Sequence, residues 1–313
     1  MGESQKFFHK NLLIKILNKH SFDPINIKKI KMGCRSHTFF VICKTKNPQF
    51  LQIYDKKLSY QAEKKHYIYS LVRQYTKLPV PLSICGYDNK IGHYLITEAI
   101  NGKTYANIQE EVSKKNKKHI MQMLGSYLAT IHSSVPIGKN FGWIQTNYVI
   151  PQGKSNIEYL LNEAARIGRW LKRCGKKKDA EEIKKYFSIE LLKSITINKK
   201  PVLVWFDISK KNVLITDKPL RVILIDPGAA RAGPKELDLI HAKLFFADTE
   251  KEFKYIISGY KKISALQLDN KTLEIYLDYF KADEYAFTLM QKWKDIAQQA
   301  RDYLVQRGIL TRS

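Results

Sequence analysis

The sequence is poor in cysteine and lacks long apolar runs, and both shortages exclude classes of protein. Its 313 residues contain 4 cysteines, which are scattered and form no C-x-x-C pair, so neither a disulfide framework nor a structural zinc site fits. No stretch reaches the roughly 18 consecutive apolar residues of a membrane-spanning helix. Charges interrupt residues 7–17, so this segment predicts an amphipathic helix and not a signal peptide. We therefore expect a cytoplasmic protein with no membrane partner.

Acidic residues are also scarce relative to basic ones. The chain has 54 Lys and Arg against 29 Asp and Glu, which gives a formal net charge of +25, and only ten of the basic residues are Arg. This charge suits a nucleic-acid-binding protein, because neutralising phosphates is the main source of non-specific affinity. No groove-reading or base-stacking motif accompanies the charge. We favour a solvated lysine surface, and nucleic-acid binding stays the least favoured alternative.

The apolar content and the length indicate a folded chain of two lobes. Hydrophobic residues make up 44% of the sequence, which excludes intrinsic disorder, and the length exceeds the roughly 250 to 300 residues at which one core stops growing. We predict an α+β fold, with a small antiparallel sheet and one helix in an N-terminal lobe at 1–97, a hinge at 98–102 and a larger, mainly helical lobe at 103–313. Expected strands cover 26–32, 38–44, 50–54, 94–97, 201–205, 213–215 and 222–225, and expected helices cover 59–75, 120–132, 156–193 (as two helices) and most of 226–307.

One short segment carries the strongest chemical signal. Asp207 is followed five residues later by Asn212, with β-rich residues on both sides, so one tight loop carries a carboxylate and an amide. Such an Asp can orient a hydroxyl for attack while the Asn binds a metal ion. Asp226 comes fourteen residues after Asn212, at the end of a predicted strand. Mg²⁺ is commonly held by one or two such oxygens together with substrate phosphates. The sequence therefore predicts a catalytic Asp207 and a metal site at Asn212 and Asp226.

This arrangement resembles the aminoglycoside phosphotransferase family of small-molecule kinases. The catalytic loop of that family reads His-Gly-Asp-x-x-x-x-Asn, and its metal-binding Asp is followed twelve residues later by a second Asp. Asp207, Asn212 and Asp226 match this pattern, and Asp238 stands at the required spacing. Further similar segments follow in the family's order at 33–40, 63, 78–81, 98–102 and 128–132. The resemblance covers about residues 26–245 and implies a protein-kinase-like fold of two lobes.

The resemblance also implies a set of nucleotide-binding residues. They are Gly33, Ser36, Gln52, Glu63 and Glu98. The family usually has Lys or Arg in place of Gln52, where it contacts the nucleotide phosphates and pairs with the Glu that we place at Glu63. A neutral Gln52 supplies no charge, so we expect weaker phosphate binding or a base located elsewhere. Lys31 and Lys44 on adjacent predicted strands are the candidates.

A second departure lies in the catalytic loop. Trp205 and Phe206 stand where the family has His-Gly. That His mainly supports the loop in kinase-like folds, so its loss is less damaging than loss of Asp207 would be. The neutral Gln52 keeps a catalytically impaired kinase, or pseudokinase, as the alternative to an active enzyme. Lys210 and Lys211 lie within the loop, either to offset charge on the transferring phosphoryl group or as solvated lysines.

The resemblance predicts an enzyme that uses ATP or GTP with Mg²⁺ to move the γ-phosphate to a hydroxyl of a small molecule. The acceptor would be an aminoglycoside-like antibiotic, a sugar or an amino alcohol, with antibiotic resistance as one setting. Partial similarity to fructosamine kinases and to streptomycin-type antibiotic kinases lies at 141–143, 225–227, Gly233 and 236–239. A Trp that fructosamine kinases carry in the catalytic loop is replaced here by Ser209-Lys210. Four acids at helical spacing would form either a solvated helix face or a site for a polycationic acceptor. They are Glu274, Asp278, Asp283 and Glu284.

Overall fold

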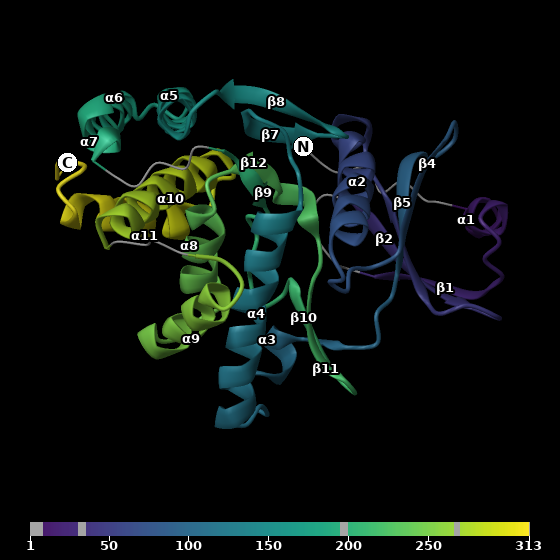
Figure 1. The fold of residues 1–313 in the computed structure, drawn as a ribbon. Coiled ribbons are helices and arrows are strands. Elements are labelled where there is room, and N and C mark those ends of the chain that lie inside the picture. The colour runs from purple at the N-terminus through teal and green to yellow at the C-terminus, as the bar shows by residue number, and fades with distance from the viewer. Residues whose placement is uncertain (1–8, 31–35, 195–199, 266–269, 313) are drawn as a thin grey trace. The chain divides into compact units, whose positions relative to one another are not determined.

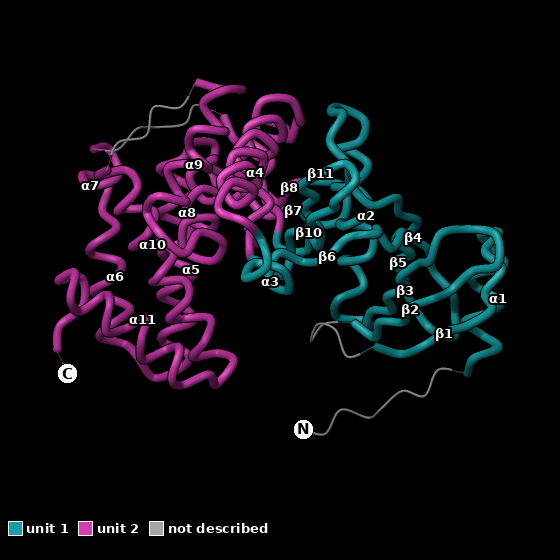
Figure 2. Tube along the Cα trace, turned by 90° about the horizontal axis from the view of Figure 1, so that it is seen from below, with its two compact units in different colours: residues 1–112, 144–148, 210–229 teal, residues 113–143, 149–209, 230–313 magenta. Residues whose placement is uncertain are grey.

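The computed structural model describes residues 9–30, 36–194, 200–265 and 270–312. The chain forms two compact units, each built from three segments of sequence (Figure 2). The first unit contains residues 1–112, 144–148 and 210–229, and the second contains residues 113–143, 149–209 and 230–313. The lobe boundaries expected from the sequence, with a hinge at 98–102, stay a prediction.

A five-stranded antiparallel sheet forms the centre of the first unit. Its strands lie in the order β1-β2-β3-β5-β4, and each pairs antiparallel with its neighbours. Gln52 of β3 lies opposite Thr38 of β2 and Leu95 of β5. This is the small antiparallel sheet that the sequence predicts. The strands are β1 (Pro24–Ile30), β2 (His37–Cys43), β3 (Gln49–Ile53), β4 (Ser83–Asp88) and β5 (Gly92–Glu98).

Helices cover both faces of this sheet (Figure 1). Successive side chains of a strand point to opposite faces. Leu51 and Ile53 of β3 belong to the apolar cluster that includes α1, whereas Tyr54 packs with Ala62 of α2. Gln52 therefore faces α2. The elements outside the sheet here are α1 (Lys10–Lys19), the 3-10 helix η1 (Lys56–Leu58) and α2 (Tyr60–Tyr75).

A smaller sheet in the first unit carries the hairpin that ends at Asn212 and Asp226. Its strand order is β11-β10-β6. Val213 lies opposite Leu224 at the open end of the β10–β11 hairpin, and Asp217 lies at its turn. The elements of this region are β6 (Lys103–Thr104), α3 (Tyr105–Ile108), β10 (Val213–Asp217), β11 (Leu220–Leu224) and the 3-10 helix η2 (Pro227–Ala229).

The second unit is mainly helical around one small sheet. The sheet has the order β8-β7-β12-β9, and Arg231 of β12 lies opposite both Trp143 and Val204. Helix α4 packs against α9, and α10 packs against α5 and α11. The strands are β7 (Phe141–Gln145), β8 (Tyr148–Gly153), β9 (Val202–Val204) and β12 (Arg231–Gly233). The helices are α4 (Lys114–Ser134), α5 (Asn156–Arg173), α6 (Lys177–Tyr186), α7 (Ile189–Lys193), α8 (Glu236–Phe245), α9 (Glu250–Lys261), α10 (Asn270–Met290) and α11 (Lys294–Gln306).

Helices α4 and α9 approach so closely that their crossing requires glycine. A Cβ atom on Gly125 would collide with the backbone carbonyl oxygen of Ile256, and one on Gly259 would collide with that of Gln122. The hydroxyl of Ser126 donates a hydrogen bond of 2.9 Å to the carbonyl of Gly259. The contact between the two helices is therefore backbone against backbone, which fixes their separation.

Most of the predicted elements are confirmed, with differences in the short ones. The expected pair of helices at 156–193 is three helices, because Gly175 at φ +78° ends the first and Ser188 caps the third by accepting from the N–H of Leu191. Strands β4, β6, β7, β8 and β12 are not predicted. The predicted strand at 26–32 ends in residues that lie outside the described ones. In the described part of the chain, no helix has both the length and the apolar character needed to cross a membrane.

Candidate active site

Asp207 follows the buried strand β9 and two residues, Trp205 and Phe206, whose backbone is bound by one carboxylate. The backbone N–H of Trp205 donates to Oδ2 of Asp238 at 2.8 Å, and that of Phe206 donates to Oδ1 at 2.6 Å. Asp238 lies in α8 and is fully buried. Hydrogen bonds to an ionised acceptor are stronger than neutral ones. Asp238 in α8 therefore anchors the two residues before Asp207, which explains why an Asp is needed at this position of the sequence.

His132 completes this anchor. Its Nε2 atom lies 3.0 Å from Oδ2 of Asp238 and its Nδ1 atom lies 2.9 Å from the hydroxyl of Tyr260. A carboxylate can only accept, so Nε2–H is the donor. The chain of contacts joins α4, α8 and α9 inside the second unit. The structure thus brings together the 128–132 segment and Asp238, which the sequence singles out separately.

Phe206 adopts an unusual backbone conformation directly before Asp207. Its φ is +71°, a left-handed value that is uncommon for a bulky residue. The surroundings hold it, because the guanidinium carbon of Arg231 lies 3.4 Å from the ring centroid and the ring of His241 lies 4.4 Å away. Strain of this kind is kept where neighbouring contacts over-determine the position. The residue directly before Asp207 is therefore a strained position that its neighbours hold in place.

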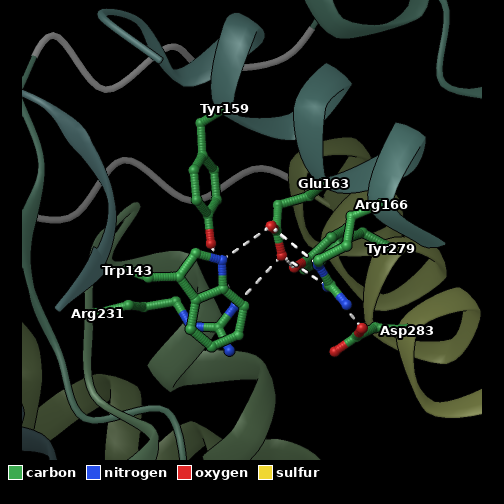
Figure 3. Close-up of polar contacts among 7 residues, drawn as sticks. All are labelled: Trp143, Tyr159, Glu163, Arg166, Arg231, Tyr279 and Asp283. Carbon is green, nitrogen blue, oxygen red and sulfur yellow. Dashed lines mark hydrogen bonds and ion pairs between the residues drawn. The ribbon is translucent and has the colours of Figure 1, made fainter. Parts of the chain in front are cut away.

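Arg231 also belongs to a buried polar cluster that the sequence does not reveal. The Glu163 cluster consists of Trp143, Tyr159, Glu163, Arg166, Arg231, Tyr279 and Asp283 (Figure 3). Glu163 is fully buried and accepts from Tyr279 Oη at 2.7 Å and from Arg166 at 2.7 Å. Burial raises the pKa of Glu163, but Arg166, Arg231 and Tyr279 outweigh it and the pKa is lowered. The cluster fixes Arg231, and through it the ring of Phe206.

Asn212 and Asp226 lie at the open end of the β10–β11 hairpin, one residue before β10 and two residues after β11. The N–H of Ile225 donates to the carbonyl oxygen of Asn212 at 3.0 Å. The N–H of Asp226 donates to the hydroxyl of Tyr69 in α2 at 2.9 Å, and Asp226 has a left-handed φ of +55°. Its carboxylate is half exposed. The two predicted metal ligands are thus neighbours in the first unit, whereas Asp207 belongs to the second.

Lys65 of α2 is a basic residue beside Asp226 that the sequence analysis does not single out. Its Nζ lies 2.8 Å from Oδ1 of Asp226 and 5.4 Å from the ring centroid of Tyr54. Burial lowers the pKa of Lys65, but Asp226 and Tyr54 raise it by more, so the ammonium stays charged. Of the two candidates from the sequence, Lys44 is exposed and Lys31 lies outside the described residues, so both stay predictions. The sequence contains one sign of this position, because Lys65 comes three residues after Ala62 on the apolar side of the helix.

Gln52 of β3 has a neutral side chain that is hydrogen bonded to two neighbouring side chains. The Tyr54 hydroxyl donates to its Oε1 at 3.1 Å, and its Nε2 donates to Oγ of Ser36 at 3.5 Å. Ser36 and Gln52 are therefore brought together, as the resemblance implies. Gly33 lies outside the described residues.

The two predicted acids of the nucleotide site have other partners. Glu63 lies with Oε1 3.5 Å from Nδ1 of His93, in a contact on β5 that does not involve Gln52. Glu98 ends β5 and accepts from the side-chain amide of Asn47 at 3.2 Å. Their roles in nucleotide binding stay predictions.

The four acids of α10 do not form a free acidic face. Asp278 is fully buried and accepts from Tyr186, Tyr303 and Arg307. The other three pair with cations, Glu274 with Arg307, Asp283 with Arg166 and Glu284 with Lys281. The expectation of a solvated helix face is wrong for Asp278, because the helical period cannot tell which aromatic hydroxyls will cover an acid.

The predicted metal site consists of Asn212 and Asp226. Among the described residues, no three His, Cys, Asp or Glu side chains gather in a way that could hold a metal ion. One amide and one half-exposed carboxylate nevertheless suit Mg²⁺, which keeps waters and takes substrate phosphates as its remaining ligands. The donor set fits a metal that arrives with a nucleotide and not a resident structural metal.

Comparison with known families decides where this arrangement belongs. Residues 26–265 match the model of the phosphotransferase enzyme family, a range that includes Asp207, Asn212, Asp226 and Asp238. The chain belongs to the phosphotransferase enzyme family. No curated protein matches it.

Solved structures of the same fold include proteins named as aminoglycoside or macrolide phosphotransferases. A variant of aminoglycoside phosphotransferase APH(4)-Ia in a ternary complex with ADP and hygromycin B has a TM-score of 0.69 at 15% identity, covering 96% of this chain and 99% of that one. The GDP and kanamycin complex of APH(2″)-IIia gives 0.66 at 11%, covering 95% and 98%. Macrolide 2′-phosphotransferase type I gives 0.65 at 14%, covering 94% and 96%. At these identities the likeness shows the fold, and the predicted α+β, protein-kinase-like fold of this family member is confirmed.

Proposed function

We propose that this small-molecule phosphotransferase uses ATP or GTP with Mg²⁺ and transfers the terminal phosphate to a hydroxyl group. The acceptor is an aminoglycoside-like antibiotic, a sugar or an amino alcohol. Support comes from the family, and from ADP, GDP, hygromycin B and kanamycin in the complexes of proteins with the same fold. The observation that carries the proposal is the backbone hydrogen bond from the N–H of Ile225 to the carbonyl oxygen of Asn212, which pairs Asn212 with the residue directly before Asp226 at the open end of one hairpin.

Each residue has a defined part in this reaction. Asp207 orients the acceptor hydroxyl and takes its proton as the hydroxyl oxygen forms a bond to the γ-phosphorus. The bond between that phosphorus and the bridging oxygen breaks, and the nucleoside diphosphate leaves with the electron pair. Asn212 and Asp226 hold Mg²⁺, which neutralises charge on the phosphates when it is bound. Asp238 positions the loop through Trp205 and Phe206.

The test is a transfer assay with a defined pair of variants. Purified protein with radiolabelled ATP or GTP and Mg²⁺ is screened against aminoglycosides, sugars and amino alcohols. Asp207→Asn is expected to lower kcat by about 10² to 10⁴, the usual contribution of a general base. Asp217→Asn, which changes an exposed aspartate at the hairpin turn, is the matched control and should keep full activity. An Asp207→Asn variant with more than about a tenth of wild-type kcat removes Asp207 from this role.

An impaired kinase is the second candidate, and Gln52 is the observation that favours it. A strand position without a positive charge leaves the phosphates less firmly held. Nucleotide binding without transfer to any hydroxyl, including that of water, would favour this candidate. Transfer to one acceptor class would exclude it.

A further inference from the structure

The position on β3 that faces the candidate nucleotide site has no charge. Gln52 faces α2 and is hydrogen bonded to Tyr54 and Ser36. A nucleotide brings several negative charges, which positive side chains or a metal have to offset. An amide can donate a hydrogen bond to a phosphate, but it cannot supply that charge.

Lys65 places a charge on the same side of the sheet. It lies in α2, the helix that Gln52 faces, and its Nζ contacts both Asp226 at 2.8 Å and the ring of Tyr54 at 5.4 Å. Tyr54 in turn donates to Gln52 at 3.1 Å. One side chain therefore stands between the ammonium and Gln52, and an ion pair joins the ammonium to the candidate metal ligand.

Lys65 is a buried cation whose anionic partner is open to solvent. Lys65 is 7% exposed, whereas the side chain of its partner Asp226 is 50% exposed. Asp226 and Tyr54 offset the free-energy cost of taking this ammonium out of water, and half of the Asp226 carboxylate stays open to solvent. Buried charges retained in this way gather at functional sites. The ammonium has three N–H donors, so it can keep Asp226 and donate to a further oxygen.

We propose that Lys65 binds the nucleotide phosphates and supplies the positive charge that β3 lacks at Gln52. The inference rests on the proposed function, because it needs a nucleotide beside Asp226. The ammonium contacts two anions, the Asp226 carboxylate and a phosphate oxygen, and so keeps the candidate metal ligand and the nucleotide together. In this chain the positive charge lies on helix α2 and not on strand β3, where the family usually has it. An active enzyme therefore does not need a lysine at position 52.

Calorimetric titration with ADP and with adenosine, both in Mg²⁺, tests the proposal. Lys65→Gln removes the charge and keeps a polar side chain. Its affinity for ADP should fall about tenfold or more, while its affinity for adenosine, which has no phosphate, should stay within about twofold. Lys57→Gln changes the net charge equally at an exposed residue of η1 and should leave both affinities unchanged. Lys65→Met, which keeps the apolar stem, is the second variant if Lys65→Gln folds poorly.

A charge swap separates phosphate binding from structural support. The double variant Gln52→Lys with Lys65→Gln returns the charge to β3, and we expect it to recover most of the lost ADP affinity. Equal ADP affinity in wild type and Lys65→Gln overturns the inference and leaves the proposed function untouched. An equal loss of ADP and adenosine affinity without rescue also overturns it, since Lys65 is then structural. Lys65-dependent ADP binding without transfer to any acceptor keeps the inference and removes the proposed function, and no ADP binding by wild type overturns both.

Discussion

The Oδ1 atom of Asp238 accepts a hydrogen bond of 2.6 Å from the backbone N–H of Phe206. The same carboxylate accepts from Trp205 and His132 through Oδ2. All of these groups lie in the interior. A buried donor that loses its acceptor costs about 1 to 3 kcal/mol, so several such donors on one carboxylate make it a strong fixing point. The position of Asp207 therefore depends on a residue of a separate helix.

Asp238→Asn is expected to lower the free energy of unfolding by about 3 to 5 kcal/mol. The amide removes the charge and turns one acceptor atom into a donor, which then faces an N–H group. Urea unfolding followed by circular dichroism measures the change. Asp302→Asn alters an exposed aspartate of α11 and should change stability by less than about 0.5 kcal/mol. An Asp238→Asn protein as stable as wild type would show that these contacts do not hold the loop.

His241 of α8 gives the protein a specific sensitivity to acid. It is buried among the rings of Phe206, Phe245 and Phe280, and in the described part of the chain neither of its ring nitrogens has a hydrogen-bond partner. Burial, followed by the positive charge of Arg231, lowers the pKa of His241 from 6.5 to about 3. Between these values the unfolded chain binds a proton that the folded chain does not. Stability from this group is complete above pH 6.5 and falls by about 1.4 kcal/mol per pH unit below it.

His241→Phe should remove this part of the pH dependence. The phenyl ring suits an aromatic environment and leaves no unpaired nitrogen, so the variant should be at least as stable as wild type at pH 7. Its advantage should grow as the pH is lowered from 6.5 to 4.5. Unfolding by urea across that range measures the difference, and His119→Phe, at an exposed residue of α4, is the control. Parallel pH profiles for wild type and His241→Phe would contradict the neutral buried state of His241.

The sequence predicts the long elements of the fold better than the short ones. Helix α2 and strands β2, β3, β10 and β11 start near their predicted positions, whereas α4 begins six residues before the predicted 120–132. Strand β12 is only three residues long, and it exists because Arg231 lies opposite Trp143 and Val204, which are far away in the sequence. The local pattern of apolar and polar residues does not predict pairing between strands that are far apart in the sequence. The Glu163 cluster has the same origin, because its members come from strands and helices that only the tertiary fold brings together.

The candidate site divides in the same way. Asp207, Asn212 and Asp226 follow from spacing within a continuous loop and hairpin, and Asp238 follows from the family's spacing after Asp226. The structure gives physical support to Asp238 as an anchor. Lys65 could not be predicted in this way, because its contact with Asp226 depends on which side of α2 faces the sheet. Helical period predicts the apolar side but assigns a lysine to solvent by default. The structure places Lys65 in the interior instead.

Two helical glycines give a stability test with opposite signs. Gly125→Ala places a methyl group against the backbone carbonyl of Ile256, which cannot move aside, and should lower the free energy of unfolding by about 1 to 3 kcal/mol. Gly168→Ala in α5 meets its nearest atom, the carbonyl oxygen of Ala180, at an ordinary 3.7 Å. It should raise stability by up to about 1 kcal/mol, because alanine favours the helix. Thermal and urea unfolding compare the two variants. A harmless Gly125→Ala would mean that α4 and α9 are not held at this separation.

Removal of the charge on Asp226 is expected to abolish the effect of Mg²⁺ on nucleotide binding. In Asp226→Asn an amide replaces the charged ligand, and the metal is left with amide oxygens that bind it weakly. The carbonyl of the new side chain can still accept from Lys65, so the ion pair is lost but the fold need not change. Affinity for Mg²⁺ and ADP together should fall about tenfold or more.

The same substitution should act in the opposite direction on metal-free ADP. A carboxylate beside the phosphates repels them, so without Mg²⁺ the variant should bind ADP as tightly as wild type or more tightly. Titration of ADP with Mg²⁺ and with a chelator, on Asp226→Asn and on the control Asp217→Asn, separates the two effects. An Mg²⁺ enhancement that is equal in wild type and Asp226→Asn would exclude Asp226 as the metal ligand. A fall in affinity that is equal with and without Mg²⁺ would instead mean that Asp226 acts only through Lys65.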